Sequence, residues 1–223
     1  MLILLDTADI NDIKKGNEYY PIEGVTTNPT IIAKENRNYI EVLKDIRNII
    51  GNDKMLHVQV LGTKAEDMVK EAHFIKDTIG GNIYIKIPVI EEGIKAIKAL
   101  KKEGFNITAT AIFTPQQALV AAMAGANFVA PYVNRLDNIS ADGVNVVKEI
   151  SKLLNIHGLG TKILAASFKN VEQVHKSSLE GAHSVTLSLE ILEKLIYHPL
   201  TDSSVENFIK DWKTAYNQTQ IGL

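Results

Sequence analysis

One lysine lies within an apolar run that otherwise has the character of a buried strand. This residue is Lys86, in the segment Ile83-Tyr-Ile-Lys-Ile-Pro-Val89. Burial of an unpaired ammonium is costly, so desolvation favours the uncharged amine, which can attack a carbonyl and form a Schiff base. The alternative is a lysine whose long side chain reaches solvent or a carboxylate from the strand end. Its place near the carboxyl end of a predicted strand favours catalysis, because parallel α/β folds carry catalytic groups there.

Polar residues also stand near the carboxyl ends of the other predicted strands. The set comprises Asp6, Thr26, Asn28, Gln59, Thr110, Tyr132, Arg135 and Ser167. Each has a structural interpretation when taken alone. Asp6 and Asn28 suit helix N-caps, Ser167 can cap a following helix, and Arg135 can pair with Asp137. Gln59 and Thr110 can satisfy neighbouring backbone groups.

Taken together, these residues indicate one polar site centred on Lys86. Several strand ends would otherwise carry polar side chains without a use. Arg135 and Ser167 follow the predicted sixth and seventh strands, where barrels often bind phosphate, and both side chains suit phosphate oxygens. We therefore expect a phosphorylated small-molecule substrate.

The composition makes several other functions poor hypotheses. The 223 residues include 24 Lys and Arg, 26 Asp and Glu and no cysteine, so no basic face suits nucleic acid or a membrane surface. The six histidines lack metal-site spacing, so a metal-dependent mechanism is not expected, and the glycine-rich nucleotide loop is absent. The N-terminus does not have the pattern of a signal peptide, and no apolar run is long enough to span a membrane. A cytoplasmic location is expected.

Short apolar runs alternate with helix-period segments along the whole chain, which predicts a parallel sheet. Eight units average about 28 residues, a length that suits a strand, a helix and two loops. A single-domain (β/α)8 TIM barrel over residues 1–223 is favoured over an open doubly wound sheet, because no Gly-x-Gly-x-x-Gly follows the first strand. The predicted strands are 2–5, 24–26, 55–60, 83–87, 107–111, 128–132, 163–166 and 185–187.

Local signals predict where several helices begin and end. Thr63-x-x-Glu66 and Thr114-Pro-x-Gln117 have the pattern of capping boxes. After Pro199, residues 202–217 form one helix more than a closed barrel needs, with an apolar stripe of Val205, Phe208, Ile209 and Trp212. This helix can pack on a neighbouring subunit or on the bottom of its own barrel.

Five motifs in the chain resemble those of the small transaldolase-like family, which includes short transaldolases and fructose-6-phosphate aldolases. They are Leu5-Asp-Thr-Ala-Asp9, Gly24-Val-Thr-Thr-Asn-Pro29, Ile85-Lys-Ile-Pro88, Ala130-Pro-Tyr-Val-Asn-Arg135 and Ala165-Ala-Ser-Phe168. The resemblance implies a (β/α)8 barrel, a Schiff base on Lys86 and no metal or organic cofactor. It also implies a homo-oligomer, in rings or stacked rings such as a decamer, whose subunits exchange the C-terminal helix.

Three positions separate the two activities of that family. Transaldolases usually carry glutamate at Gln59, asparagine at Thr108 and Ser-Pro-Phe at Ala130-Pro-Tyr132, so this chain resembles the aldolases. In the aldolases the residues matching Gln59, Thr110 and Tyr132 hold a water that shuttles protons.

The expected reaction is therefore the reversible cleavage of fructose 6-phosphate to dihydroxyacetone and glyceraldehyde 3-phosphate. We expect Asp6 and Asn28 to hold substrate hydroxyls with Thr26 and Ser167 nearby, and Arg135 to bind the phosphate. One alternative is a transaldolase of the pentose phosphate pathway, which moves the dihydroxyacetone unit from fructose 6-phosphate or sedoheptulose 7-phosphate to an aldose phosphate. A second alternative is a phosphosugar-binding barrel without catalysis.

Overall fold

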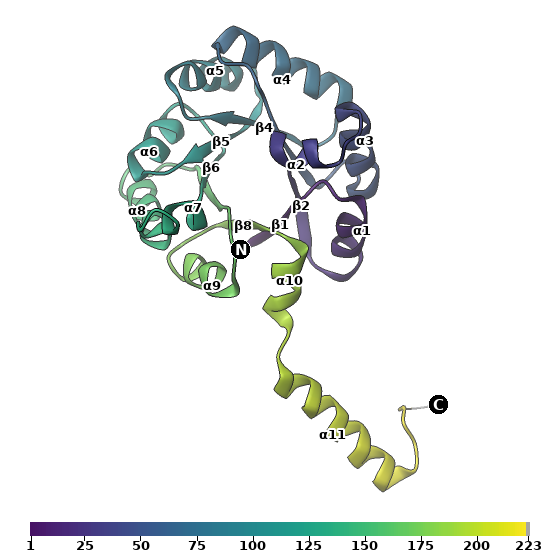
Figure 1. The fold of residues 1–223 in the computed structure, drawn as a ribbon. Coiled ribbons are helices and arrows are strands. Elements are labelled where there is room, and N and C mark those ends of the chain that lie inside the picture. The colour runs from purple at the N-terminus through teal and green to yellow at the C-terminus, as the bar shows by residue number, and fades with distance from the viewer. Residues whose placement is uncertain (222–223) are drawn as a thin grey trace. The chain divides into compact units, whose positions relative to one another are not determined.

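The computed structural model describes residues 1–221, and its eight parallel strands form a closed barrel in sequence order (Figure 1). The predicted (β/α)8 barrel is confirmed. The strands are β1 (Leu2–Asp6), β2 (Ile22–Thr26), β3 (Met55–Gln59), β4 (Ile83–Pro88), β5 (Asn106–Ile112), β6 (Phe128–Pro131), β7 (Lys162–Ala165) and β8 (Ser184–Leu187). The predicted bounds differ from these by at most two residues.

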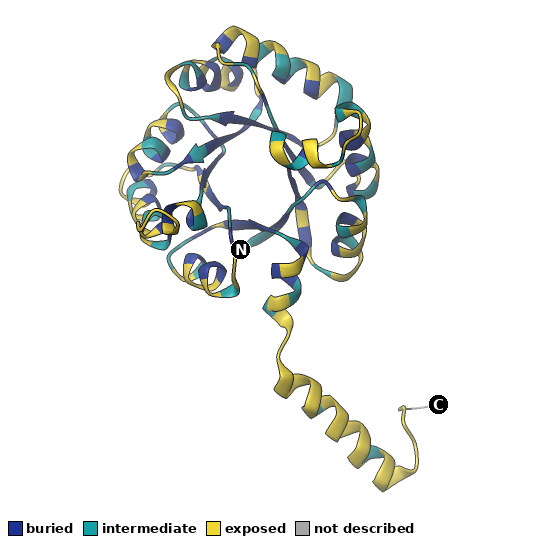
Figure 2. Ribbon diagram, in the orientation of Figure 1, coloured by how far each residue is buried: buried dark blue, intermediate teal, exposed yellow. Residues whose placement is uncertain are grey.

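The helices follow the strands along the chain. They are α1 (Ile10–Tyr19), α2 (Pro29–Lys34), α3 (Tyr39–Ile50), α4 (Ala65–Ile79), α5 (Glu91–Lys102), α6 (Pro115–Met123), α7 (Val133–Asp137), α8 (Gly143–Ile156), α9 (Val171–Leu179), α10 (Leu189–Ile196) and α11 (Pro199–Tyr216). Of these, α1, α3, α4, α5, α6, α8 and α9 surround the barrel in Figure 1. Figure 2 shows the strands as mostly buried, with exposed residues gathered on the helices. No helix within residues 1–221 is long and apolar enough to cross a membrane.

The two predicted capping boxes have different outcomes. The Thr114 box is confirmed, because its hydroxyl accepts from the Gln117 amide and the Gln117 side chain accepts from the Thr114 amide. The Thr63 box is wrong. Helix α4 starts at Ala65 without a side-chain cap, and the Ala65 amide donates instead to the carboxylate of Glu92 at 2.8 Å. A carboxylate from the next helix thus replaces the local cap.

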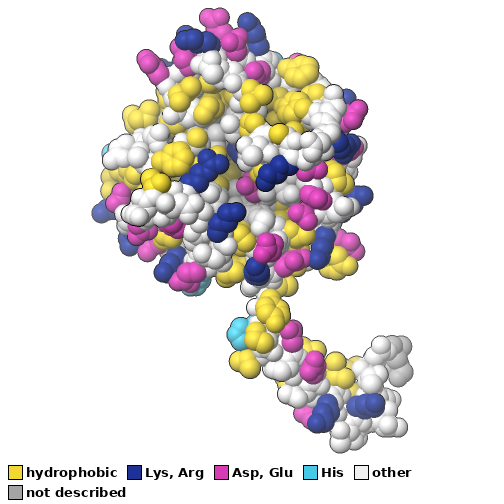
Figure 3. Space-filling model, in the orientation of Figure 1, with side chains coloured by type: hydrophobic (Ala, Val, Ile, Leu, Met, Phe, Trp, Pro, Cys, Tyr) yellow, Lys and Arg dark blue, Asp and Glu magenta, His cyan; other side chains and the backbone are white. Residues whose placement is uncertain are grey.

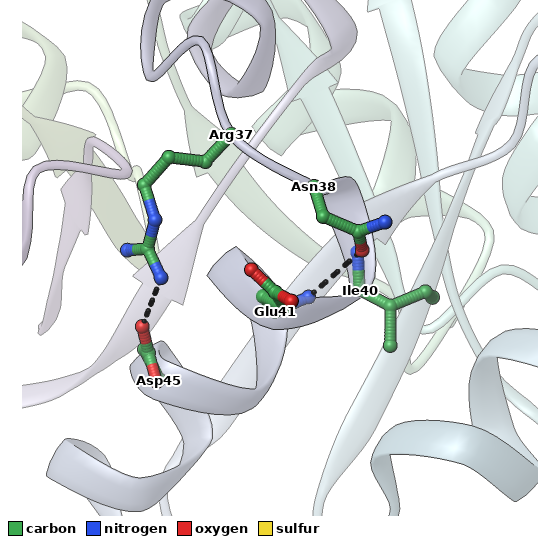
Figure 4. A network of polar contacts seen from close by, with 5 residues as sticks. All are labelled: Arg37, Asn38, Ile40, Glu41 and Asp45. Atoms are coloured by element: carbon green, nitrogen blue, oxygen red, sulfur yellow. Dashed lines mark hydrogen bonds and ion pairs between the residues drawn. The ribbon is translucent and has the colours of Figure 1, made fainter.

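Asparagine caps set the starts of the two helices after β2. The Asn28 side chain accepts from the Ile31 amide, with Pro29 as the first residue of α2. The Asn38 side chain accepts from the first amides of α3 in the same way (Figure 4). The same figure shows Arg37, just before α3, pointing toward Asp45 on that helix. The two side chains form an exposed ion pair of 2.7 Å.

Apolar side chains from several strands fill the lower part of the barrel, by which we mean the part nearer the amino ends of the strands. Residues of β1, β3, β4, β6 and β7 pack together there, so they lie inside the barrel, and we call this cluster the floor: Leu2, Leu4, Met55, Tyr84, Phe128, Ala130 and Leu164. Gly24 is required beside the floor, because a Cβ at this position would collide with the carbonyl oxygen of Met55.

The contacts divide the chain into two compact units, Met1–Ile191 and Leu192–Leu223. The first unit contains all eight strands. In the second, α11 begins three residues earlier than the predicted 202–217 helix and has no buried residue. The rings of Trp212 and Tyr216 lie 4.4 Å apart on it. Packing of this helix on a neighbouring subunit stays a prediction.

Candidate active site

A cavity of about 520 Å³ opens at the carboxyl ends of the strands. The side chains that line it include seven of the nine predicted site residues: Asp6, Thr26, Asn28, Lys86, Tyr132, Arg135 and Ser167. In Figure 3, Lys and Arg side chains gather around the hollow at the centre of the barrel. The structure therefore brings together most of the residues that the sequence analysis selected.

Lys86 projects from β4 into this cavity and is only 5% exposed. Its Nζ donates a hydrogen bond of 2.6 Å to the backbone carbonyl of Thr27. Within residues 1–221 Lys86 makes no ion pair with a carboxylate, so the interpretation of Lys86 as a partner of an acidic residue is wrong. The nitrogen is held by a neutral acceptor at the wall of a cavity large enough for a sugar phosphate.

The backbone carbonyl that accepts from Lys86 is itself fixed to the neighbouring strand. The amide and the hydroxyl of Thr27 both donate to the carbonyl of His57 on β3, each at 3.0 Å. Thr27 is fully buried, so these bonds are not exchanged with water. The position of the lysine nitrogen is therefore set by the backbone directly after β2, which is hydrogen-bonded to β3.

A second hydrogen-bonded group lies at the ends of β1, β2 and β8. The hydroxyl of Thr26 donates to the Asp6 carboxylate at 2.6 Å and lies 2.7 Å from the hydroxyl of Thr186. Thr186 also lines the cavity, although the sequence analysis missed it. Its position near the end of the predicted eighth strand is the feature of the sequence that could have identified it. These oxygens can accept from or donate to the hydroxyls of a polyol.

A hydroxyl pair occupies the other side of the site. Thr110 Oγ1 and the Tyr132 hydroxyl lie 3.0 Å apart, and the guanidinium of Arg135 lies 4.7 Å from the centre of the Tyr132 ring. The pair can relay a proton, because each hydroxyl is both a donor and an acceptor. Thr110 is fully buried and Tyr132 reaches the cavity, so the relay would run from the cavity into the barrel wall.

Two non-glycine residues beside this pair have left-handed backbone angles. Ala111 has φ of 57° within an interruption of the β5–β6 register, and Ser167 has φ of 63° at the end of β7. The Ser167 carbonyl accepts from the Asn134 amide at 2.8 Å, which ties this strained residue to α7. Such geometry is uncommon outside glycine and clusters at functional sites. Neither residue type signals it in the sequence.

Gln59 is not brought into the cavity that contains Lys86. It lies next to Lys86 in the β3–β4 register but lines a separate cavity of about 450 Å³, whose walls are mostly apolar and include Ile32, Leu61 and Phe74. The predicted grouping of Gln59 with Thr110 and Tyr132 is therefore only partly observed. Asn28 lines both cavities.

Two of the structural alternatives for single residues are also wrong. The Asp137 carboxylate accepts from the Gly143 amide and the Gln173 side chain, and it does not pair with Arg135. Helix α9 is capped by Asn170 and not by Ser167. Arg135 and Ser167 are thus left to face the cavity.

The comparisons with known proteins agree with this geometry. The sequence pattern of the family described as Transaldolase/Fructose-6-phosphate aldolase matches residues 3–221. The chain belongs to this family. The resemblance seen in the motifs is therefore confirmed, and the protein is an enzyme of the transaldolase/aldolase class.

Named relatives in the family cover the chain almost completely. A "Probable fructose-6-phosphate aldolase" of Streptococcus pneumoniae is 43% identical over 99% of this chain and 100% of its own length. A "Probable transaldolase" of Clostridium acetobutylicum is 43% identical over 98% of this chain and 100% of its own length. A "Probable transaldolase" of Petrotoga mobilis is 43% identical over 96% of this chain and 95% of its own length. Similar degrees of identity thus link the chain to relatives with either name.

The barrel of this family member also contains a buried histidine that the sequence analysis did not select. The His57 ring is fully buried, stacks on Tyr84 at 4.6 Å and lies with Nδ1 2.8 Å from the hydroxyl of Thr108. Burial holds the pKa of His57 well below 6.5, and the charge of nearby Lys86 lowers that pKa further. A neutral imidazole therefore lies between the floor and the site.

Proposed function

We propose that this family member is a Schiff-base aldolase that reversibly cleaves fructose 6-phosphate to dihydroxyacetone and glyceraldehyde 3-phosphate. The observation that carries the proposal is the buried amine of Lys86, which faces a cavity lined by Arg135 and Ser167. The amine suits attack on a ketone, and the guanidinium and hydroxyl suit a phosphate. No cofactor is required for this chemistry.

Catalysis begins when the Lys86 nitrogen attacks the C2 ketone of the sugar. Loss of water from the resulting carbinolamine gives an iminium, whose positive nitrogen can accept an electron pair. The C3–C4 bond then breaks, its electrons form the enamine, and the C4 hydroxyl becomes the aldehyde of glyceraldehyde 3-phosphate. Protonation of the enamine carbon and hydrolysis release dihydroxyacetone and restore the amine.

The hydroxyl pair of Tyr132 and Thr110 is the proposed route for the proton that leaves the C4 hydroxyl. The Tyr132 hydroxyl takes this proton as its own passes towards Thr110 or to a water. The reverse relay returns a proton to the enamine carbon. Gln59 is proposed to assist from the adjacent strand position, as the aldolase resemblance implies.

Substrate binding is assigned to the two sides of the cavity. Asp6, Thr26 and Asn28 hold the hydroxyls of the dihydroxyacetone half, since their oxygens and amide lie around the same wall. Arg135 and Ser167 hold the phosphate of the aldehyde half. Fixing both halves near attack distance contributes roughly 7 kcal/mol of barrier reduction at best.

Transaldolase activity is the second candidate, because most of the named relatives are called probable transaldolases. The two reactions share every step up to the enamine. An aldolase protonates the enamine and releases it, whereas a transaldolase retains it until an acceptor aldehyde arrives. Access of a proton from Tyr132 favours release.

Incubation with fructose 6-phosphate alone distinguishes the two reactions. We expect glyceraldehyde 3-phosphate to accumulate together with an equal amount of free dihydroxyacetone. If the aldehyde is released only when erythrose 4-phosphate is added, the protein is a transaldolase and the aldolase assignment is wrong.

A barrel that binds phosphosugars without catalysis is tested by reduction of the imine. Borohydride added with dihydroxyacetone should attach the three-carbon unit covalently to the peptide that contains Lys86. The Lys86→Met variant is the control and should gain no mass. A wild-type protein that also gains none is a binder and not a Schiff-base enzyme.

The assembly and location proposed for this enzyme rest on the sequence. We infer a cytoplasmic homo-oligomer in which the apolar face of α11, formed by Val205, Phe208, Ile209 and Trp212, packs on a neighbouring subunit. Val205, Phe208 and Ile209 are exposed in the single chain. Sedimentation of the Phe208→Ser variant should give smaller particles than the wild type.

A further inference from the structure

Lys34 lines the cavity that contains Lys86, although no step of the proposed reaction uses it. It is the last residue of α2 and is exposed. Within residues 1–221 its ammonium has no carboxylate partner. Three lysines elsewhere on the surface do have one, at Lys70, Lys148 and Lys176. The charge of Lys34 is therefore available to a ligand.

The cavity has an excess of cationic side chains. Besides the amine of Lys86, three cationic side chains line it, against the two carboxylates of Asp6 and Glu190: Lys34, Arg135 and Lys169. The Asp6 carboxylate already accepts from the hydroxyl of Thr26. Because the whole chain carries a formal charge of −2, this concave site differs in sign from the average of the molecule. Such a site concentrates anionic ligands.

Lys34 and Arg135 belong to opposite sides of the barrel. Helix α2 follows β2 and α7 follows β6, and these two strands are four positions apart in either direction around the closed ring of eight. Figure 1 shows α2 and α7 on opposite sides of the barrel centre. A phosphate in the cavity can therefore be approached by cations from two walls. The long, flexible stem of lysine allows it to follow such a ligand.

We propose that Lys34 is a specificity-determining residue that binds the substrate phosphate from the wall opposite Arg135. Its charge makes the enzyme prefer phosphorylated aldehydes over the same aldehydes without phosphate. The proposal rests on the aldolase or transaldolase function proposed above. A purely structural role would be interaction with the negative end of the α2 dipole, which would not depend on the substrate.

The test compares two acceptor aldehydes in the addition of dihydroxyacetone. For Lys34→Gln we expect kcat/KM to fall about tenfold with glyceraldehyde 3-phosphate, through KM, and to change less than about twofold with glyceraldehyde. Lys44→Gln, at an exposed position on α3, is the matched control and should leave both values unchanged. Equal losses with both aldehydes, or no loss with either, would overturn the proposal.

A binding measurement keeps the test independent of turnover. Inorganic phosphate is titrated calorimetrically into the wild type and into Lys34→Gln, and we expect about tenfold weaker binding by the variant. Equal affinity contradicts the assignment of Lys34. Failure of the proposed function can be distinguished from failure of this proposal. It would be seen as a lack of borohydride trapping with dihydroxyacetone, a ligand that contains no phosphate.

Discussion

The lower and upper parts of the barrel interior differ sharply in chemistry over a short distance. On β4, the floor residue Tyr84 and Lys86, the proposed nucleophile, are two positions apart, about 7 Å along the strand. On β1, the same step separates Leu4 from Asp6. The floor contains packed apolar groups, whereas the upper part contains an amine, a carboxylate and several hydroxyls.

This difference shows how one barrel separates stability from reactivity. Burial of the floor residues away from water stabilises the folded barrel, and these residues do not need to move. The residues above them include a buried lysine and a strained Ser167, whose proposed roles in the reaction come at some cost in stability. The floor must therefore compensate for the site, and four substitutions test this division of roles.

The largest effect is expected for Lys86→Met. Cleavage of fructose 6-phosphate should fall by at least about 10⁴-fold, because the nucleophile is lost. The urea concentration at half-unfolding should stay the same or rise, since a buried polar amine is replaced by an apolar chain. Activity that survives in this variant, measured by release of glyceraldehyde 3-phosphate, would contradict the role of the amine.

Truncation of the floor by Phe128→Ala should have the opposite pattern of effects, with a large loss of stability and a small loss of activity. We expect unfolding free energy to fall by about 3–5 kcal/mol, because a fully buried ring leaves a cavity. The kcat per folded molecule should change much less. Urea titration and active-site counting by borohydride trapping measure the two quantities. A large fall in kcat without loss of stability would show that the floor takes part in chemistry.

Tyr132→Phe removes one hydroxyl and should reduce kcat for cleavage about 10²-fold. The Lys86 imine with dihydroxyacetone should still form, since no proton relay through Tyr132 is needed to trap it. Tyr84→Phe is the matched control in the floor and should retain normal kcat. Equal effects of the two substitutions would mean that the Tyr132–Thr110 pair has no special role.

The smallest effect concerns pH and the buried His57. Its pKa lies below the unfolded value of 6.5, so the unfolded chain binds the additional proton. The stability from this group is fully present above pH 6.5 and falls as pH decreases, by up to about 1.4 kcal/mol per pH unit. In His57→Phe, this part of the decrease in unfolding free energy at low pH should disappear, as measured by urea unfolding at pH 7.0 and 5.5. The exposed His175→Gln variant should keep it.

The strands and most of the site follow directly from the sequence. Buried parallel strands are short apolar runs, and a polar residue at the end of such a run is conspicuous, as at Lys86 and Asp6. Asn28-Pro29 marks a helix start and also a cavity wall, and the structure contains both features. These signals are local, so they can be read without coordinates.

Features that depend on contacts distant in sequence could not be predicted. The Ala65 amide is satisfied by Glu92 from another helix, which overrides the local Thr63 pattern. Gln59 lines a second cavity because of the helices that pack beside it, which its own strand does not indicate. Left-handed backbone at Ala111 has no signal in an alanine.

The hydrogen bond from Lys86 to the carbonyl of Thr27 has a consequence for every step of the proposed catalytic cycle. The free amine, the carbinolamine, the iminium and the enamine each retain at least one N–H on this nitrogen. A single backbone oxygen can therefore anchor every covalent intermediate in turn, and its partial negative charge favours the cationic iminium most. The hydrogen bond to this nitrogen therefore need not rearrange as the bound sugar changes.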